Sequence, residues 1–185
     1  MKSEEISKKI IEVASDFEGM FEIKSNSVWS DPIHSDELRL LLKKAGWKPG
    51  WAYCAAFVEA VWVKAYTDLG APAHVINFIA KNMNPSVVSS FANFDGHGLI
   101  KKEPVPGAVM FLQKGSTPRG HAGLVTAYDS KAKVYDTIEG NTSARAITAE
   151  QDRNGDGIFK KKRNLRYDKR EGKLNLIGFL HPIEW

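Results

Sequence analysis

Residues 120–141 read GHAGLVTAYDSKAKVYDTIEGN, and this stretch decides the fold. Two runs within it, 121–128 and 134–140, are rich in Val, Ile, Tyr and Thr and follow the two-residue alternation of β-strands. Residues 129–133 separate the runs and have a plausible length for a hairpin loop. The stretch therefore predicts an antiparallel hairpin.

The register of this hairpin decides which side chains meet. If Tyr128 pairs with Val134, the residue numbers of every pair add up to 262. Asn141 then lies opposite His121, and Glu139 lies on the same face of the hairpin. Such neighbours have side-chain origins roughly 4.5 to 8 Å apart. The register thus predicts a polar cluster of His121, Glu139 and Asn141, which a slip of one residue would destroy. The alternative is a solvated outer face, which also carries alternating polar residues.

Helices are expected before this hairpin, and further strands on both sides of it. Apolar residues recur at helical spacing in helices that begin near Ser3, Ser35 and Ala52, and a short helix is expected over Val75–Lys81. Ser3 and Ser35 are the expected N-caps. Strands are expected near 107–112, 121–128, 134–140, 157–163 and 174–181. This order predicts an α+β fold with N-terminal helices packed on an antiparallel β-sheet.

Length and composition limit the class of protein. A chain of 185 residues with 43% hydrophobic residues fits one folded domain over 1–185. Cys54 is the only cysteine, which excludes an intramolecular disulfide and zinc modules built from several thiolates. The longest apolar stretch, Ala55–Val63, is interrupted by Glu59 and is far shorter than the roughly 20 residues of a transmembrane helix. Residues 1–9 are charged and show no signal peptide.

The net charge of +4 favours a polyanionic partner, either nucleic acid or a phosphate-rich bacterial envelope. The run Lys160–Arg163 suggests a nucleic-acid patch. In a strand, however, its side chains alternate between two faces, and no stacking aromatics accompany it. We therefore expect no nucleic-acid binding.

Residues 152–157, DRNGDG, match the start of a calcium-binding loop. The twelfth position of that loop requires a bidentate Glu, and Arg163 stands there instead. The dipeptides Asn154-Gly155 and Asp156-Gly157 are better interpreted as hairpin turns. We expect no metal ion and no cofactor.

Cys54 lies at the predicted start of the third helix. Unpaired backbone N–H groups and the helix dipole favour a thiolate at such a position, as a nucleophile requires. The alternative is packing, because Cys is often buried and Cys54 also ends an apolar stripe with Val58 and Val61. A nucleophilic thiol would need a base and a group that orients the base, which the predicted His121 cluster offers.

Four segments carry a resemblance to a known family. They are GWAYCAAFV (50–58), VPGAVMF (105–111), GHAGLV (120–125) and TIEGN (137–141). In this order they resemble the CHAP family of cysteine- and histidine-dependent amidohydrolases and peptidases, relatives of the NlpC/P60 group that cleave peptidoglycan. The resemblance spans residues 21–185 and implies a papain-like, NlpC/P60-like fold.

The resemblance also implies roles for the predicted site residues. Cys54 would be the nucleophile, His121 the general base and acid, and Glu139 and Asn141 the groups that orient or polarise the imidazole. We also expect Trp51 and Tyr53 to line the substrate groove, with core packing as the alternative for large aromatics.

Two departures from the family stand out. Tyr53 occupies a position that is often Trp, and Ala108 one that is often acidic. Neither removes a catalytic group.

The implied activity is that of a monomeric peptidoglycan amidase or endopeptidase that forms a Cys thioester. Without a visible signal peptide, such an enzyme would be made in the cytoplasm and reach the bacterial cell wall or periplasm by release or injection, as a phage endolysin or an antibacterial effector does. Two alternatives remain open: a cysteine peptidase or acyltransferase that acts on a protein, and a non-catalytic wall-binding domain.

Overall fold

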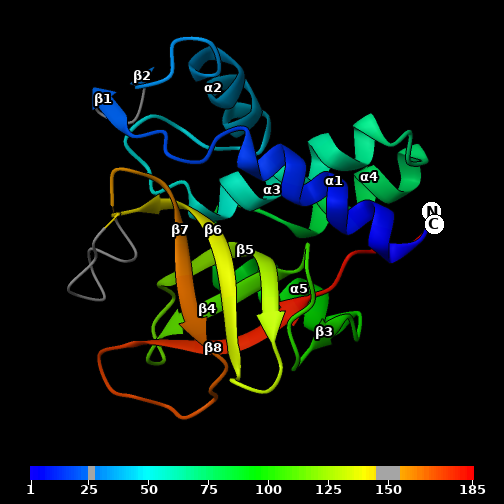
Figure 1. The fold of residues 1–185 in the computed structure, drawn as a ribbon, viewed down its shortest axis with the longest axis vertical. Helices are drawn as coiled ribbons and strands as arrows, with labels where there is room; N and C mark the ends of the chain where they lie inside the picture. Colours follow the sequence, from blue (N-terminus) through cyan, green and yellow to red (C-terminus); the bar gives the residue numbers. More distant parts are fainter. Residues whose placement is uncertain (25–27, 145–154) are drawn as a thin grey trace.

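The structure is a computed structural model that describes residues 1–24, 28–144 and 155–185. Helices dominate the first half of the chain and strands the second, as predicted (Figure 1). The helices are α1 (Ser3–Ser15), α2 (Ser35–Lys44), α3 (Cys54–Asp68), α4 (Ala73–Asn82) and α5 (Val87–Gly96). The strands are β1 (Glu22–Lys24), β2 (Val28–Trp29), β3 (Ile100–Lys101), β4 (Val109–Lys114), β5 (Gly120–Asp129), β6 (Val134–Thr142), β7 (Gly157–Asn164) and β8 (Leu174–Leu180). The predicted combination of helices and an antiparallel sheet is confirmed.

The described strands form two antiparallel sheets. The large sheet has the order β3-β8-β4-β5-β6-β7, and β1 pairs with β2 beside it. All five predicted strands are present, each within two residues of its predicted bounds. Strands β1, β2 and β3 were not predicted, because two or three residues are too few to display an alternation.

The helix predictions are confirmed for α1 to α4, but both predicted N-caps are wrong. Lys2 and His34 occupy the cap positions, so Ser3 and Ser35 are already helical. The hydroxyl of Ser35 instead accepts a hydrogen bond from the backbone N–H of Trp29, at 3.1 Å. Helix α5 was not predicted, because Ser, Asn, Asp and Gly make up much of its sequence and have modest helix propensity.

The predicted hairpin register needs one correction. Tyr128 pairs with Tyr135, whereas Val134 pairs with Asp129, so the loop is one residue shorter than expected. A bulge between Val125 and Ala127 absorbs that residue. Beyond the bulge, Leu124 pairs with Ile138, so the residue numbers again add up to 262. This register keeps Glu139 on the predicted face.

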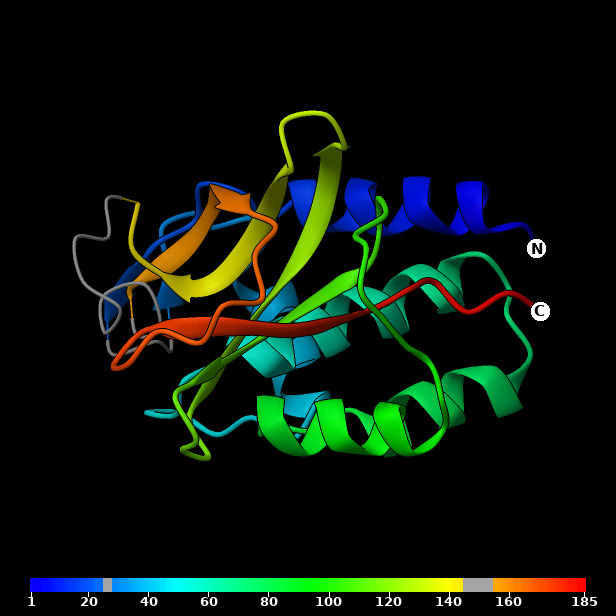
Figure 2. The ribbon, with the colours of Figure 1, turned by 90° about the horizontal axis from the view of Figure 1, so that it is seen from below.

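Apolar side chains cover both faces of the large sheet. Helices α1, α3 and α5 contact one face, while the other face carries a second apolar cluster of its own. Figure 2 shows the strong twist of the strands from below, with α1 (blue) above them and α5 (green) below them in this view. The second cluster consists of Ala108, Met110, Leu112, Val125, Tyr135, Leu174, Leu176 and Phe179. His121 lies on this second face, because it pairs directly with Leu112.

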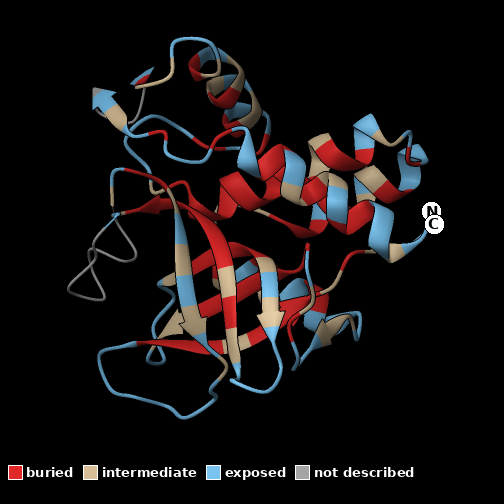
Figure 3. Ribbon diagram, in the orientation of Figure 1, coloured by how far each residue is buried: buried red, intermediate tan, exposed pale blue. Residues whose placement is uncertain are grey.

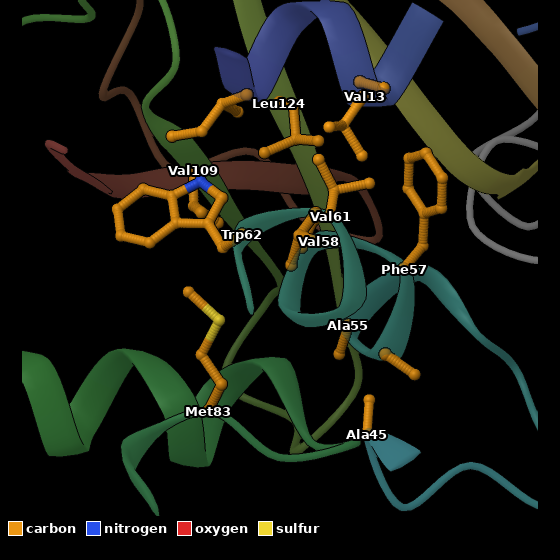
Figure 4. Packing of buried hydrophobic residues seen from close by; sticks show 14 of the residues in the cluster. Val13, Ala45, Ala55, Phe57, Val58, Val61, Trp62, Met83, Val109 and Leu124 are labelled. Atoms are coloured by element: carbon orange, nitrogen blue, oxygen red, sulfur yellow. The ribbon is translucent and has the colours of Figure 1, made fainter. Parts of the chain in front are cut away.

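Helix α3 lies at the centre of the fold. It contacts α1, α2, α4, β5 and β6, and buried positions run around most of its surface (Figure 3). Figure 4 shows Val58, Val61 and Trp62 among side chains from α1, the sheet and the end of α4. The predicted apolar stripe is therefore buried, but α3 is enclosed on its other sides as well, which a stripe alone does not indicate.

The enclosure of α3 buries one carboxyl group, Glu59. Its side chain lines a cavity of about 70 Å³ with mainly apolar neighbours, and among the described residues its Oε2 atom has no hydrogen-bond partner. Burial raises the pKa of Glu59 to about 8. The carboxyl group is therefore protonated at neutral pH.

We expect Glu59→Gln to stabilise the protein at alkaline pH. Between the ordinary pKa of Glu and about 8, the folded chain retains a proton that the unfolded chain has released, so stability falls as pH rises through this window. Gln resembles the neutral carboxyl and does not titrate. In urea unfolding, the variant should match the wild type near pH 5 and exceed it by about 2 to 4 kcal/mol near pH 9. The exposed Glu171→Gln is the matched control, and parallel pH curves for Glu59→Gln and wild type would refute the prediction.

Candidate active site

Cys54 is the first residue of α3, and its side chain is 5% exposed. The backbone N–H of Tyr53, directly before it, donates a hydrogen bond to Oδ1 of Asn141 at 2.9 Å. Asn141 has a φ of +57°, in the left-handed region that Asn adopts more readily than most residues, and β6 bulges between Glu139 and Thr142. This bulge brings the end of β6 against the start of α3, where the helix dipole favours a thiolate.

His121 and Glu139 face one another across β5 and β6. Nε2 of His121 and Oε2 of Glu139 are 2.8 Å apart, and both side chains are fully buried. Gly123 makes room for this pair, since a Cβ at that position would lie 2.5 Å from Cγ of Glu139. The predicted proximity of His121 and Glu139 is therefore present.

Two further side chains bind the carboxylate of Glu139. Thr137 donates its hydroxyl to Oε1 at 2.5 Å. Arg163 donates from Nε to Oε1 at 2.9 Å and from Nη2 to Oε2 at 2.5 Å. Burial alone would raise the pKa of Glu139, but the charge of Arg163 and the hydrogen bond with His121 outweigh it and hold that pKa well below the usual range. Glu139 is thus a buried, permanently charged carboxylate.

Because Nε2 of His121 binds Glu139, only Nδ1 of the ring can interact with Cys54. Nδ1 is buried and, within the described residues, has no hydrogen-bond partner of regular geometry. The thiol is nevertheless close enough to affect the imidazole. Burial would lower the pKa of His121, but the nearby Cys54 thiol and the hydrogen bond with Glu139 raise it to about 9.

The same interaction acts on the thiol. Burial would raise the pKa of Cys54, but His121 and the backbone N–H groups of Ala122 and Ala55 lower it below its ordinary value. A lowered thiol pKa beside a raised imidazole pKa favours the thiolate–imidazolium pair at neutral pH. Such a pair is the activated form of a cysteine nucleophile.

The two predicted orienting residues have different contacts. Glu139 binds the imidazole of His121 directly. The side-chain oxygen of Asn141 binds the backbone just before Cys54 and so holds the start of α3. The structure thus separates two residues that the sequence placed in one cluster.

The two aromatic residues expected to line a groove also separate. Trp51 is 49% exposed, with the ammonium group of Lys48 5.4 Å from its ring centre. Tyr53 is completely buried, its ring packs edge-on against Trp29, and its hydroxyl accepts a hydrogen bond from the Trp29 indole at 3.5 Å. Tyr53 therefore belongs to the core, as the alternative interpretation held, and only Trp51 offers surface to a ligand.

Arg163 and Thr137 were missed by sequence reasoning. Thr137 lies two residues before Glu139, so the two share a strand face, and this spacing was a usable signal. The sequence singled out Arg163 only as part of a basic run and as the residue that breaks the calcium-loop pattern. The predicted alternation in that run is present, because Lys160 and Lys162 are exposed and pair with Glu18 and Asp136, whereas Arg163 turns inward. No local pattern identifies Glu139 as its partner.

Two further predictions concern metal binding and membrane-spanning helices. Residues 152–154 of the calcium-like stretch lie outside the described residues. The predicted turn at Asn154-Gly155 is therefore described only at Gly155. Within the described ranges, no group of three or more His, Cys, Asp or Glu side chains is placed to hold a metal ion. No described helix is both long enough and apolar enough to cross a bilayer.

Comparisons with family models, with curated proteins and with solved structures found no match for this chain.

Proposed function

We propose that this protein is a cysteine hydrolase that cleaves an amide bond of peptidoglycan through a thioester on Cys54. The observation that carries the proposal is the grouping of Cys54, His121 and Glu139, in which His121 interacts with both of the others. Three elements, α3, β5 and β6, bring these residues together from positions far apart in the sequence. A thiol, a base and a carboxylate that orients the base are the parts of a nucleophilic acyl-transfer site.

The first half of the reaction forms the thioester. The Cys54 thiolate attacks the carbonyl carbon of the amide, and the backbone N–H of Cys54 donates to the developing oxyanion. The imidazolium of His121 then gives its proton to the departing nitrogen as the C–N bond breaks. The products of this half are a free amine and an acyl group bound to sulfur.

The second half releases the acid. His121, now neutral, takes a proton from water, whose oxygen attacks the thioester and displaces the Cys54 thiolate. Glu139 keeps Nε2 of His121 occupied throughout, so Nδ1 faces the reacting atoms. Water and amines can both act as the acceptor, and the acceptor decides between hydrolysis and acyl transfer.

The substrate class rests on the resemblance to CHAP domains. In support, Cys54 is the first residue of the central helix α3 and His121 lies on the adjoining antiparallel sheet, as a site of the kind implied by the resemblance requires. The net charge of +4 favours approach to an anionic bacterial envelope.

Incubation of the protein with purified sacculi tests the proposal. Mass spectrometry of the soluble products should show new amine and carboxyl ends. Ends at the junction of glycan and peptide identify an amidase, and ends within the peptide identify an endopeptidase. If sacculi stay intact while an unfolded protein is cleaved, the peptidase alternative replaces the proposal. Products extended by an added amine identify a transferase.

A further inference from the structure

Arg163 contributes a bidentate charged contact to the candidate site, through Glu139. Its guanidinium forms two parallel hydrogen bonds with the Glu139 carboxylate, one from Nε and one from Nη2. The Arg163 side chain is only 18% exposed, and Glu139 is fully buried. A bidentate pair of this kind fixes the plane of the carboxylate as well as its distance.

The carboxylate oxygens are shared in a way that links Arg163 to the imidazole. Oε2 accepts from Arg163 and bonds to Nε2 of His121, while Oε1 accepts from Arg163 and from Thr137. Rotation of the carboxylate would break the contact with Arg163 and the contact with His121 together. The orientation of the imidazole is therefore coupled to the position of the guanidinium.

We propose that Arg163 is a positioning residue of the candidate site: its guanidinium holds the Glu139 carboxylate against Nε2 of His121, so that the imidazole presents Nδ1 to the Cys54 thiol, and it offsets the charge of that carboxylate. The role in hydrolysis rests on the function proposed above. The effect on the thiol and the imidazole does not, because it can be measured without any substrate.

The positive charge of Arg163 lowers the pKa of the titratable groups around it. Within the described residues, the charged and titratable side chains on this face or beside the guanidinium include Cys54 from α3, His121 from β5, Tyr135 and Glu139 from β6, Lys161 and Arg163 from β7, and Arg166 and Arg170 after it. Removal of one positive charge from this group makes every proton in it harder to lose. Without Arg163, both the formation of the Cys54 thiolate and the deprotonation of His121 should move to higher pH.

A cavity next to the guanidinium allows a second kind of test. Its volume is about 160 Å³, and Arg163, Arg166, Arg170 and Leu112 are among its lining residues. A free guanidinium ion is small enough to enter such a space from solvent. Chemical rescue of a shortened side chain is therefore feasible.

The experiment compares Arg163→Met, Arg163→Lys and Arg166→Met in the full chain. Arg166 lines the same cavity and carries the same charge, but pairs with Asp168 on the surface, so it is the matched control. Two quantities are measured: the rate of Cys54 alkylation by iodoacetamide across pH, and the hydrolysis of sacculi across pH.

Arg163→Met should raise the pH midpoint of alkylation and both limbs of the activity profile, and should reduce hydrolysis about 100-fold. Arg163→Lys should restore the pH midpoints but only part of the rate, because an ammonium group cannot make the two parallel bonds. Guanidinium chloride at millimolar concentration, but not sodium chloride, should partly rescue Arg163→Met. Since guanidinium weakens folding, such rescue cannot come from stabilisation of the fold. Arg166→Met should match the wild type in both measurements.

Unchanged pH midpoints in folded Arg163→Met would overturn the proposal, even if its rate of hydrolysis fell. A shift of equal size in Arg166→Met would overturn it too, because general charge would then explain the effect. If the wild type cleaves no sacculi, the proposed function fails, while the alkylation profiles still decide whether Arg163 controls the thiol and the imidazole.

Discussion

Replacement of Cys54 by alanine should abolish amide hydrolysis and leave the fold intact. Loss of the nucleophile from a site of this type lowers kcat by about a million-fold, because the base and the oxyanion donor have no bond-forming partner. Cys54 is a small residue at the first position of α3, so alanine fits the same space and suits the helix. Release of fragments from sacculi should fall to background, and the unfolding midpoint in urea should change little.

Two controls separate chemistry from binding. Cys54→Ser keeps a hydroxyl of similar size, but a Ser hydroxyl is not ionised at neutral pH, so it should be nearly as inactive. Cosedimentation with sacculi should be retained in both variants, since neither alters exposed surface. If Cys54→Ala still releases fragments, the enzymatic interpretation of Cys54 is refuted. If the wild type binds sacculi but releases nothing, the non-catalytic wall-binding alternative is favoured.

The fold was predictable where a pattern repeats over several turns or strand residues. Helices α1 to α3 and the five long strands each have enough residues to show their period. Helix α5 is as long as α2, but its polar residues and Gly96 weaken the local preference for a helix. Its packing on β4 and β5 decides its conformation. Tertiary contacts of this kind leave no trace in a short window of sequence.

The candidate site was predictable in part because two local deviations cancel. The hairpin loop is one residue shorter than assumed, and the bulge between Val125 and Ala127 restores the count before Glu139. The position of Asn141 was less predictable, since a second bulge in β6 and a left-handed φ direct its side chain to the start of α3. Bulges depend on packing against neighbours, so the alternation that reveals a strand does not locate them.

Glu139→Gln should lower activity less than Cys54→Ala but more than Arg163→Met. The amide can donate to Nε2 of His121, which would place the ring proton on Nδ1 and leave no acceptor for the thiol proton. Loss of the orienting carboxylate in a comparable triad lowers kcat about ten-thousand-fold. The same change removes the Glu139 carboxylate from Arg163, and breaking a buried pair in this way costs about 3 kcal/mol of folding free energy. Urea unfolding and sacculus hydrolysis of the variant measure the two losses separately.

The double variant Glu139→Gln with Arg163→Met tells these two losses apart. Removal of both charges leaves neither buried group unpaired, so most of the lost stability should return. Activity should stay as low as in Glu139→Gln, because the imidazole still lacks its carboxylate. The wild type should also lose stability as the pH falls below the ordinary pKa of Glu, since the pKa of Glu139 is depressed in the folded state, and the double variant should lose less. If activity returned together with stability, Glu139 would act through the fold alone, and the grouping of Cys54, His121 and Glu139 would no longer support acyl-transfer chemistry.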